Sequence, residues 1–598
     1  MSTPKTAKMP IAITHYSDLD LSCQHLTTAN FMEFNVAYQR ELVPRQSIDI
    51  DMTTFVRMES LPVPTYGNCD IHNRAYFVPY RTVMRGWNEF IDDSTVVTYN
   101  GDVIYPSTPC LSSTELINLF INGYGYAEDL GPLFSVEDAY DFVYYNSSGE
   151  SFAYKFTVLG KYTYKLLCSL GIKIHFDIRT ETIYSALPLL SLMRVYSDWY
   201  FPSAYVDDEE MNALRKWFEK EPTDDVREFA DEFDAGSMSI VFSRLFHVAY
   251  DSDYFVSSWD NPVAPSSSAF SFTRINDVTN DGLPSNRADV STDFTNGTPL
   301  VNSGSSLSQF AVDALKAVTD YMRRNQISGA RVLDRYLSRW GIQLPSAKLN
   351  RSEWIGESTS KFVFGDVFST ADTDGANLGS YAGRGAGRNS KAGIVSYTSS
   401  EFGMLIIISS IVPKTAYFQG CDRNVFHLNR LDFYTPEYDN LGVQALSTSE
   451  LYVPTGELNP EDANESINYD NAVFGFVPRY SEYKRGYDNM TGDFVLGTQA
   501  ASNRGWSLMR DVSDYYYSRD TTRYEDIVHS LSFVDAKDWQ QYNRIFNVVS
   551  PIEDKFKIIH NFVVKSRFPG KPMYDSYEFR EEDKAQKVTI DVNGVRAN

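Results

Sequence analysis

The sequence predicts a mainly β protein, and three observations support this fold class. Residues 402–413 contain the apolar run Met404–Ile408 and end in a proline, which is typical of a strand buried on both faces, because a half-exposed strand alternates. Ile48, Ile50 and Met52 alternate with two aspartates, which is the pattern of a half-buried strand. The 40 tyrosines and 38 phenylalanines suit broad, half-exposed surfaces, where the ring buries area and the tyrosine hydroxyl keeps a polar partner.

The charge balance limits the function classes. The chain of 598 residues carries 78 acidic and 54 basic residues, a net charge of −24. A dedicated nucleic-acid-binding protein has the opposite sign. Contact with DNA or RNA is therefore expected to be local, or to be mediated by a separate basic partner.

The cysteines and the hydropathy pattern limit the setting. The five cysteines are far apart and form no CxxC pair, so reduced thiols are expected, with neither a disulfide framework nor a zinc ribbon. The N-terminus lacks the apolar core of a signal peptide, and no stretch is long and apolar enough to span a membrane. No membrane partner is expected.

The chain divides into five predicted regions. Residues 1–30 are polar and predict an N-terminal arm; residues 31–92 predict the first strands, punctuated by prolines. Residues 93–307 predict long insertions with helices, one of which opens at the capping box Ser112–Glu115. Residues 308–345 predict a helix pair, and residues 346–598 predict the remaining strands, loops and a C-terminal tail.

Two further helices and one long loop are predicted within the insertions. Leu187–Phe201 and Asp208–Lys220 have helical spacing. Residues 262–307 are rich in Ser, Asn, Asp, Gly and Thr and too poor in large apolar residues to form a core. This segment predicts an exposed loop that carries function or forms a surface projection.

A glycine-rich stretch invites a phosphate-binding interpretation. Residues 379–388 lack GxxxxGK[ST], and Arg388 stands where a dinucleotide loop has its last glycine, so a flexible connection is favoured. Arg384, Arg388 and Lys391 remain candidates for non-specific contact with nucleic-acid phosphates. Lys565 and Arg567 belong to a locally basic C-terminal segment and are candidates for the same role, with an ordinary solvated face as the alternative.

Residues 480–487 hold the densest mixture of tyrosine with arginine and lysine. Tyr480, Tyr483, Arg485 and Tyr487 are candidates for a subunit interface, since such mixtures form protein–protein hot spots or stack on bases. A plain strand-and-turn surface fits the composition equally well.

No catalytic or metal-binding motif is found. The eight histidines form no HExxH and no pair at ligand spacing, and no G-x-S-x-G elbow occurs. A carboxylate pair for sugar hydrolysis stays open, because its spacing is set only in space. We therefore expect no enzymatic activity, no metal and no cofactor.

Several blocks, taken in order, resemble the major capsid proteins of microviruses, in particular the gokushovirus-like branch. They span roughly residues 36 to 570 and include Leu61–Thr65, Ala75–Pro79 with Trp87–Phe90, Leu378–Gly383, Ile411–Gly420, Tyr434–Tyr438 and Phe474–Lys484. Each block alone is weak, and their shared order makes the resemblance specific.

The resemblance implies an eight-stranded antiparallel jelly-roll with long interstrand insertions, so that residues 31–92 and 346–598 supply its strands. It implies sixty self-associating copies in a T=1 icosahedral shell around circular single-stranded DNA. Implied partners are a small basic DNA-packaging protein, a pilot or minor spike protein and the host cell surface, with residues 262–307 as the candidate attachment projection. The implied location is the virion, assembled in the bacterial host cytoplasm.

Two other function classes remain open from the residues alone. A glycan-binding β-sandwich, such as a receptor-binding or adhesin module, fits the aromatic content and the acidic charge. A β-rich hydrolase with a carboxylate pair is the third hypothesis. Saccharide binding by an isolated monomer or trimer, or turnover of a polysaccharide, distinguishes these two from a shell subunit.

Overall fold

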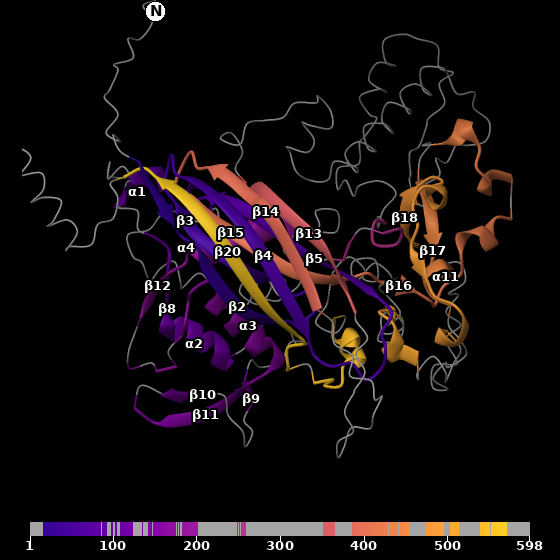
Figure 1. The fold of residues 1–598 in the computed structure, drawn as a ribbon, viewed down its shortest axis with the longest axis horizontal. Coiled ribbons are helices and arrows are strands. Elements are labelled where there is room, and N and C mark those ends of the chain that lie inside the picture. The colour runs from indigo at the N-terminus through magenta and orange to yellow at the C-terminus, as the bar shows by residue number, and fades with distance from the viewer. Residues whose placement is uncertain are drawn as a thin grey trace, which may run out of the picture.

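The fold is described from a computed structural model (Figure 1). The residues that the structure describes are 16–84, 87–91, 97–99, 102–104, 108–122, 134–135, 142–145, 148–174, 176–177, 179, 182–200, 248, 250–251, 253–258, 351–364, 386–428, 430–439, 443–453, 473–495, 503–512, 539–550 and 552–570.

Two facing antiparallel sheets form the body of the molecule (Figure 1). The five-stranded sheet has the order β1-β20-β4-β14, and β2 also pairs with β20. Its strands are β1 Ser17–Asp20, β2 Cys23–Ala29, β4 Ser47–Met58, β14 Ala386–Thr398 and β20 Phe556–Phe568. The four-stranded sheet has the order β13-β5-β15-β3. Its strands are β3 Asn35–Leu42, β5 Asn68–Pro79, β13 Glu353–Val363 and β15 Gly403–Pro413.

The path of the chain between these sheets is consistent with a jelly-roll. The chain alternates between the two sheets from β2 to β5. It stays in the four-stranded sheet from β5 to β13, and it then alternates again through β14, β15 and β20. Double-sheet jelly-rolls have this arrangement. The predicted mainly β class is confirmed. The two sheets contain nine strands when β1 and β2 are counted separately, because these two pair with opposite ends of β20.

Strand β15 lies inside the four-stranded sheet and explains the apolar run in the sequence. All eleven of its residues are buried, and it pairs with β5 on one side and β3 on the other. Leu405 and Ile407 pack in the core between the two sheets. Met404 and Ile406 pack in a second core that includes insertion residues. Both faces of the strand are therefore covered, so neither face needs polar residues.

The sandwich is tight where β13 approaches β14. A β-bulge interrupts the pairing of β13 with β5 between Trp354 and Gly356. A Cβ atom added to Gly356 would lie 1.8 Å from the carbonyl oxygen of Ile394 in β14. Only glycine allows this approach without a shift of the backbone.

The insertion between β5 and β13 covers the outer face of the four-stranded sheet with helices and small sheets (Figure 1). Its described helices are α1 Trp87–Ile91, α2 Ser113–Asn122, α3 Val158–Ser169 and α4 Leu187–Val195, which continues as a π-helical turn, Tyr196–Tyr200. Its described strands are β6 Val97–Tyr99, β7 Asp102–Ile104, β8 Cys110–Ser112, β9 Phe134–Ser135, β10 Phe142–Tyr145, β11 Ser151–Phe156 and β12 Ile183–Ser185. The helices predicted at the capping box and at residues 187–201 are confirmed.

A distal lobe lies at the end of the molecule away from α2 and α3 (Figure 1). Its elements are β16 Ala416–Tyr417, β17 Val443–Ser447, α11 Thr448–Leu451, β18 Val473–Pro478 and β19 Asp488–Asn489. It has a core of its own, to which Tyr254, Phe255, Tyr417 and Leu446 contribute.

Short 3-10 turns occur along the described chain at Tyr80–Thr82, Arg423–Phe426, Arg430–Asp432, Pro436–Tyr438, Ser481–Tyr483, Gly492–Phe494, Arg504–Trp506 and Trp539–Ile545.

Several local predictions differ from the structure or cannot be compared with it. Residues 17–29 of the predicted arm form β1 and β2, so this part belongs to the five-stranded sheet. The end of the glycine-rich stretch, from Ala386, forms β14 rather than a loose connection. The predicted helix at 208–220, the loop 262–307 and the helix pair 308–345 lie outside the described residues. Among the described helices, none is long and apolar enough to cross a membrane.

Candidate functional site

The distal lobe carries a group of exposed aromatic side chains, which we call the aromatic patch: Phe433, Tyr434, Tyr438 and Tyr483. Phe433 is 54% exposed and Tyr483 is 51% exposed. The rings of Tyr434 and Tyr483 lie 5.8 Å apart, and His427 lies between Phe433 and Tyr483 at 5.4 and 6.2 Å. Val425 and Leu428, in the same segment of the chain, are also exposed. Large apolar side chains thus gather on one part of the surface.

Tyr480 supports this patch from below. It is buried, and its ring lies 5.1 Å from the ring of Tyr434. Its backbone has φ 64°, a left-handed conformation that is uncommon for a bulky residue. The amide of Tyr480 donates a hydrogen bond to Oε1 of Gln444 at 2.9 Å, which holds the turn in place. The guanidinium of Arg479 lies 5.3 Å from the ring of Tyr438. The exposed rings therefore rest on a fixed support.

The structure places all four predicted interface residues in the turn that follows β18. Tyr483 is a member of the aromatic patch, and Tyr480 lies beneath it. Arg485 is exposed and donates a hydrogen bond to the Ser257 hydroxyl. Tyr487 packs on the core of the distal lobe, with its ring 4.9 Å from Phe255, and burial raises the pKa of its hydroxyl. Of the four, Tyr483 presents the largest apolar area to a partner.

Three members of the patch were not predicted from the sequence: Phe433, Tyr434 and Tyr438. The signal was present, because Tyr434 and Tyr438 flank Pro436 in a block used for the resemblance. Exposed apolar patches mark interaction surfaces, and aromatic residues are enriched at the centres of protein–protein interfaces. The arrangement is suited to association with another protein surface.

A second surface is the outer face of the five-stranded sheet, which we call the open sheet face. Lys565 and Arg567 lie on it, exposed, near the end of β20. Lys565 pairs across the strands with Asp49 of β4 and Asp20 of β1, and Arg567 pairs with Asp18 of β1. The pKa of Asp20 is lowered, mainly by hydrogen bonds from Ser22 and further by the charge of Lys565. Acidic side chains therefore surround these two predicted phosphate contacts.

The remaining basic candidates are less well placed by the structure. Arg388 and Lys391 lie in β14, in register with Phe55 and Met52 of β4, and Arg384 lies outside the described residues. Lys555, in the same basic segment as Lys565, is buried, and its ammonium donates to the carbonyl of Ser550 at 2.7 Å. The C-terminal basic segment therefore does not form one continuous basic surface.

A buried charge cluster joins the insertion to the sandwich. The ammonium of Lys165 in α3 lies 2.7 Å from Oε1 of Glu33 and 2.9 Å from Oδ2 of Asp554. Burial raises the pKa of Glu33. Lys161 adds a contact to Asp554 at 3.3 Å. A pocket of about 520 Å³ lies beside the cluster, between α3 and the strands β2 and β3.

This cluster contains two carboxylates that lie close together, as a carboxylate-pair hydrolase would need. The ammonium of Lys165 occupies the position between Glu33 and Asp554, where a substrate oxygen would have to lie. The cluster is thereby satisfied internally. Its evident role is to fix α3 against the segments that lead into β3 and β20.

Comparison with known proteins is consistent with the jelly-roll topology. The family model described as "Capsid protein (F protein)" matches residues 7–114 and 256–548, which is more than half of the chain. The chain belongs to this capsid protein family. This confirms the resemblance to microvirus capsid proteins and gives the protein a structural role in a phage virion.

Individual relatives agree with the family assignment. This capsid protein is 22% identical to "Capsid protein VP1" of Chlamydia phage 1, over 85% of this chain and 89% of the relative. It is 20% identical to "Capsid protein VP1" of Bdellovibrio phage phiMH2K, over 82% of this chain and 84% of the relative. A shorter match, 23% identical over 170 residues, links it to "Capsid protein VP1" of Spiroplasma virus 4.

Proposed function

We propose that this capsid protein assembles as sixty copies into a T=1 icosahedral shell that encloses a circular single-stranded DNA genome. The observation that carries the proposal is the aromatic patch on a protein of the capsid family. A shell needs contacts that are modest singly and large in sum. Half-exposed rings on a fixed support provide such contacts, because little ordering is needed when they become buried.

The patch acts, in this proposal, as one contact between neighbouring copies. It lies in the distal lobe, at the end of the molecule away from α2 and α3 (Figure 1). Tyr483 and Phe433 would enter the neighbouring subunit, while Tyr480 holds their support. Arg485 adds a polar rim. Central aromatic anchors with a polar rim are the usual composition of such interfaces.

The open sheet face is proposed to face the genome, with Lys565 and Arg567 as its contacts. On the described part of this face, the carboxylates of β1 and β4 outnumber these two cations near the end of β20. Bare DNA would be repelled by the carboxylates. A small basic DNA-packaging protein between the sheet and the DNA resolves this conflict, and the net charge of −24 supports the same partner.

Within this proposal, residues 262–307 and a pilot or minor spike protein attach the virion to the host cell surface. The shell assembles in the bacterial host cytoplasm. The composition of the segment supports a surface loop. Deleting residues 266–304 is expected to leave shell formation intact and to reduce attachment. Loss of shell formation would show that the segment belongs to the fold or to a subunit contact instead.

Assembly itself is tested with the purified chain, alone and with circular single-stranded DNA plus a basic peptide. Sedimentation and electron microscopy are expected to show closed particles of one size that form more readily when both additions are present. A chain that stays monomeric under all these conditions contradicts the proposal. Closed particles that never protect the DNA from nuclease would limit the proposal to shell formation.

A further inference from the structure

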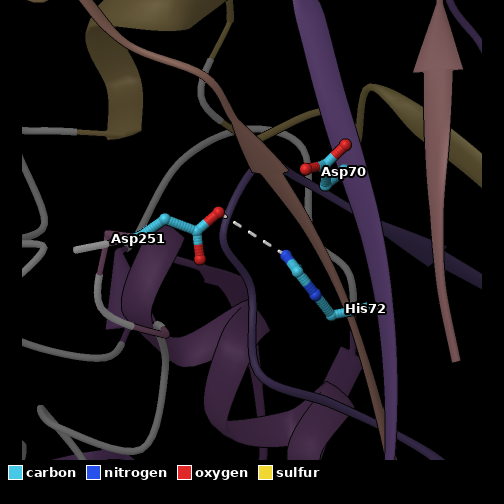
Figure 2. Close-up of side chains that lie close together, drawn as sticks. All are labelled: Asp70, His72 and Asp251. Carbon is cyan, nitrogen blue, oxygen red and sulfur yellow. Dashed lines mark ion pairs between the residues drawn. The ribbon is translucent and has the colours of Figure 1, made fainter. Parts of the chain in front are cut away.

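Three side chains meet at the junction between β5 and the segment that leads into the distal lobe: Asp70, His72 and Asp251 (Figure 2). Asp70 and His72 lie on β5 and are buried, and Asp251 is exposed. One ligand atom from each lies within 4.8 Å of the other two, and this is the only such group of three among the residues that the structure describes. Figure 2 shows the imidazole of His72 directed at Asp251.

The hydrogen bonds around His72 fix its tautomer. Nδ1 lies 3.1 Å from the hydroxyl oxygen of Thr359, and that hydroxyl donates to Oε1 of Glu357 at 3.1 Å. A hydroxyl has one proton to donate, so Thr359 accepts from Nδ1–H. The proton of a neutral His72 is thereby held at Nδ1, and Nε2 carries a lone pair.

This lone pair faces a carboxylate. Nε2 of His72 is buried without a hydrogen-bond partner, although the side chain is 10% exposed overall, and it lies 3.7 Å from Oδ2 of Asp251. A lone pair opposite a carboxylate is unfavourable unless a positive centre lies between them. Either a proton on Nε2 or a bound cation meets that requirement.

Asp70 distinguishes these two possibilities. Its Oδ2 lies 3.4 Å from the ammonium of Lys414, while its Oδ1 is buried without a hydrogen-bond partner. A proton on Nε2 of His72 would satisfy one acceptor. A metal ion would satisfy the imidazole and both carboxylates together.

We propose that Asp70, His72 and Asp251 bind a divalent transition metal ion of the Zn²⁺ class. One imidazole and two carboxylates suit Zn²⁺, whereas Ca²⁺ and Mg²⁺ prefer oxygen ligands alone. Ligand distances of about 2.1 Å place tetrahedral ligand atoms roughly 3.4 Å apart. The three ligand atoms lie within 4.8 Å of one another, so the group needs to contract by up to about 1.4 Å. The exposed Asp251 provides this movement. Thr359 and Glu357 act as the outer-shell partners that orient the imidazole.

The metal would fasten the distal lobe to the sandwich. Asp251 lies two residues before Asp253, whose carboxylate accepts from the Tyr417 hydroxyl at 2.7 Å and from the amides of Phe255 and Val256. The segment is therefore already anchored in the distal lobe, and a metal shared with β5 would add a second anchor.

The test measures Zn²⁺ binding to the metal-free full-length chain by isothermal titration, with Ca²⁺ and Mg²⁺ in parallel. One tight Zn²⁺ per chain is expected, with far weaker Ca²⁺ and Mg²⁺. D251N is expected to lose at least about tenfold in Zn²⁺ affinity. Asp251 is 55% exposed, so this variant should fold like the wild type. D49N removes an exposed carboxylate distant in sequence from any histidine and is expected to bind like the wild type.

A second readout is the visible spectrum of bound Co²⁺, which reports nitrogen and oxygen ligation directly. The spectrum of the wild type is expected to change in H72Q. Absence of a stoichiometric Zn²⁺ site, equal affinity in D251N and the wild type, or equal loss in D251N and D49N would each overturn the proposal. A proton held between His72 and Asp251 would then account for the geometry. Neither result depends on shell formation, so the assembly proposal stands or falls separately.

Discussion

Replacing the two most exposed rings of the aromatic patch by serine, F433S with Y483S, is predicted to weaken shell assembly without unfolding the subunit. Each ring is about half exposed, which corresponds to roughly 100 Å² of area available for burial. That area contributes about 2.5 kcal/mol per ring, and ordering each side chain costs about 1 kcal/mol. About 3 kcal/mol remains for the pair, or roughly a hundredfold in association.

The assay is the critical concentration for particle formation, measured by light scattering and analytical sedimentation. The double variant is expected to assemble only at a roughly hundredfold higher concentration. The matched control is Y66S, because Tyr66 is 70% exposed but lies beside Trp506, outside the patch. An unchanged critical concentration for a folded double variant, or an equal rise for Y66S, would refute the role of the patch.

Three further predictions concern stability, each measured by denaturant unfolding of the subunit. I407A is expected to lower the unfolding free energy by about 2–5 kcal/mol, because Ile407 is fully buried between the two sheets, whereas V563A on the open sheet face should cost well under half as much. Equal losses would contradict the burial of β15 in the core between the sheets. K165M is expected to cost about 3–5 kcal/mol, since it leaves Glu33 without an ammonium partner and Asp554 with Lys161 alone. A neutral result would show that the cluster does not hold α3 against the sandwich. Burial lowers the pKa of His560 to about 3, below the value of about 6.5 in the unfolded chain. The folded state therefore loses about 1.4 kcal/mol of stability per pH unit as the pH falls from about 6.5 toward 3, and loses none above about pH 6.5. H560N should flatten that slope, and an unchanged slope would show that other groups cause it.

Strands with a covered face could be predicted from the sequence. The run in β15 and the alternation in β4 reflect burial, and burial selects side chains directly. Strand β2 was not predicted, because most of its side chains are partly or fully exposed. It is held by backbone pairing to β20, and backbone hydrogen bonds leave no pattern in the side chains.

The surfaces could be predicted only in part. The density of tyrosine after β18 indicated Tyr483, but its neighbour Phe433 is 50 residues away in the chain, and only the folded distal lobe brings them together. The acidic surroundings of Lys565 depend on strand pairing with β1 and β4, whose residues lie more than 500 positions earlier. No metal ligand was expected at His72, because no spacing rule relates it to Asp251.

Electron cryomicroscopy of the assembled protein tests the central claim most directly. The account predicts closed icosahedral shells in which Phe433 and Tyr483 are buried against a neighbouring copy and Lys565 and Arg567 face the interior. Shells with these rings open to solvent and the open sheet face on the outside would contradict it, as would a protein that forms no closed particle at all.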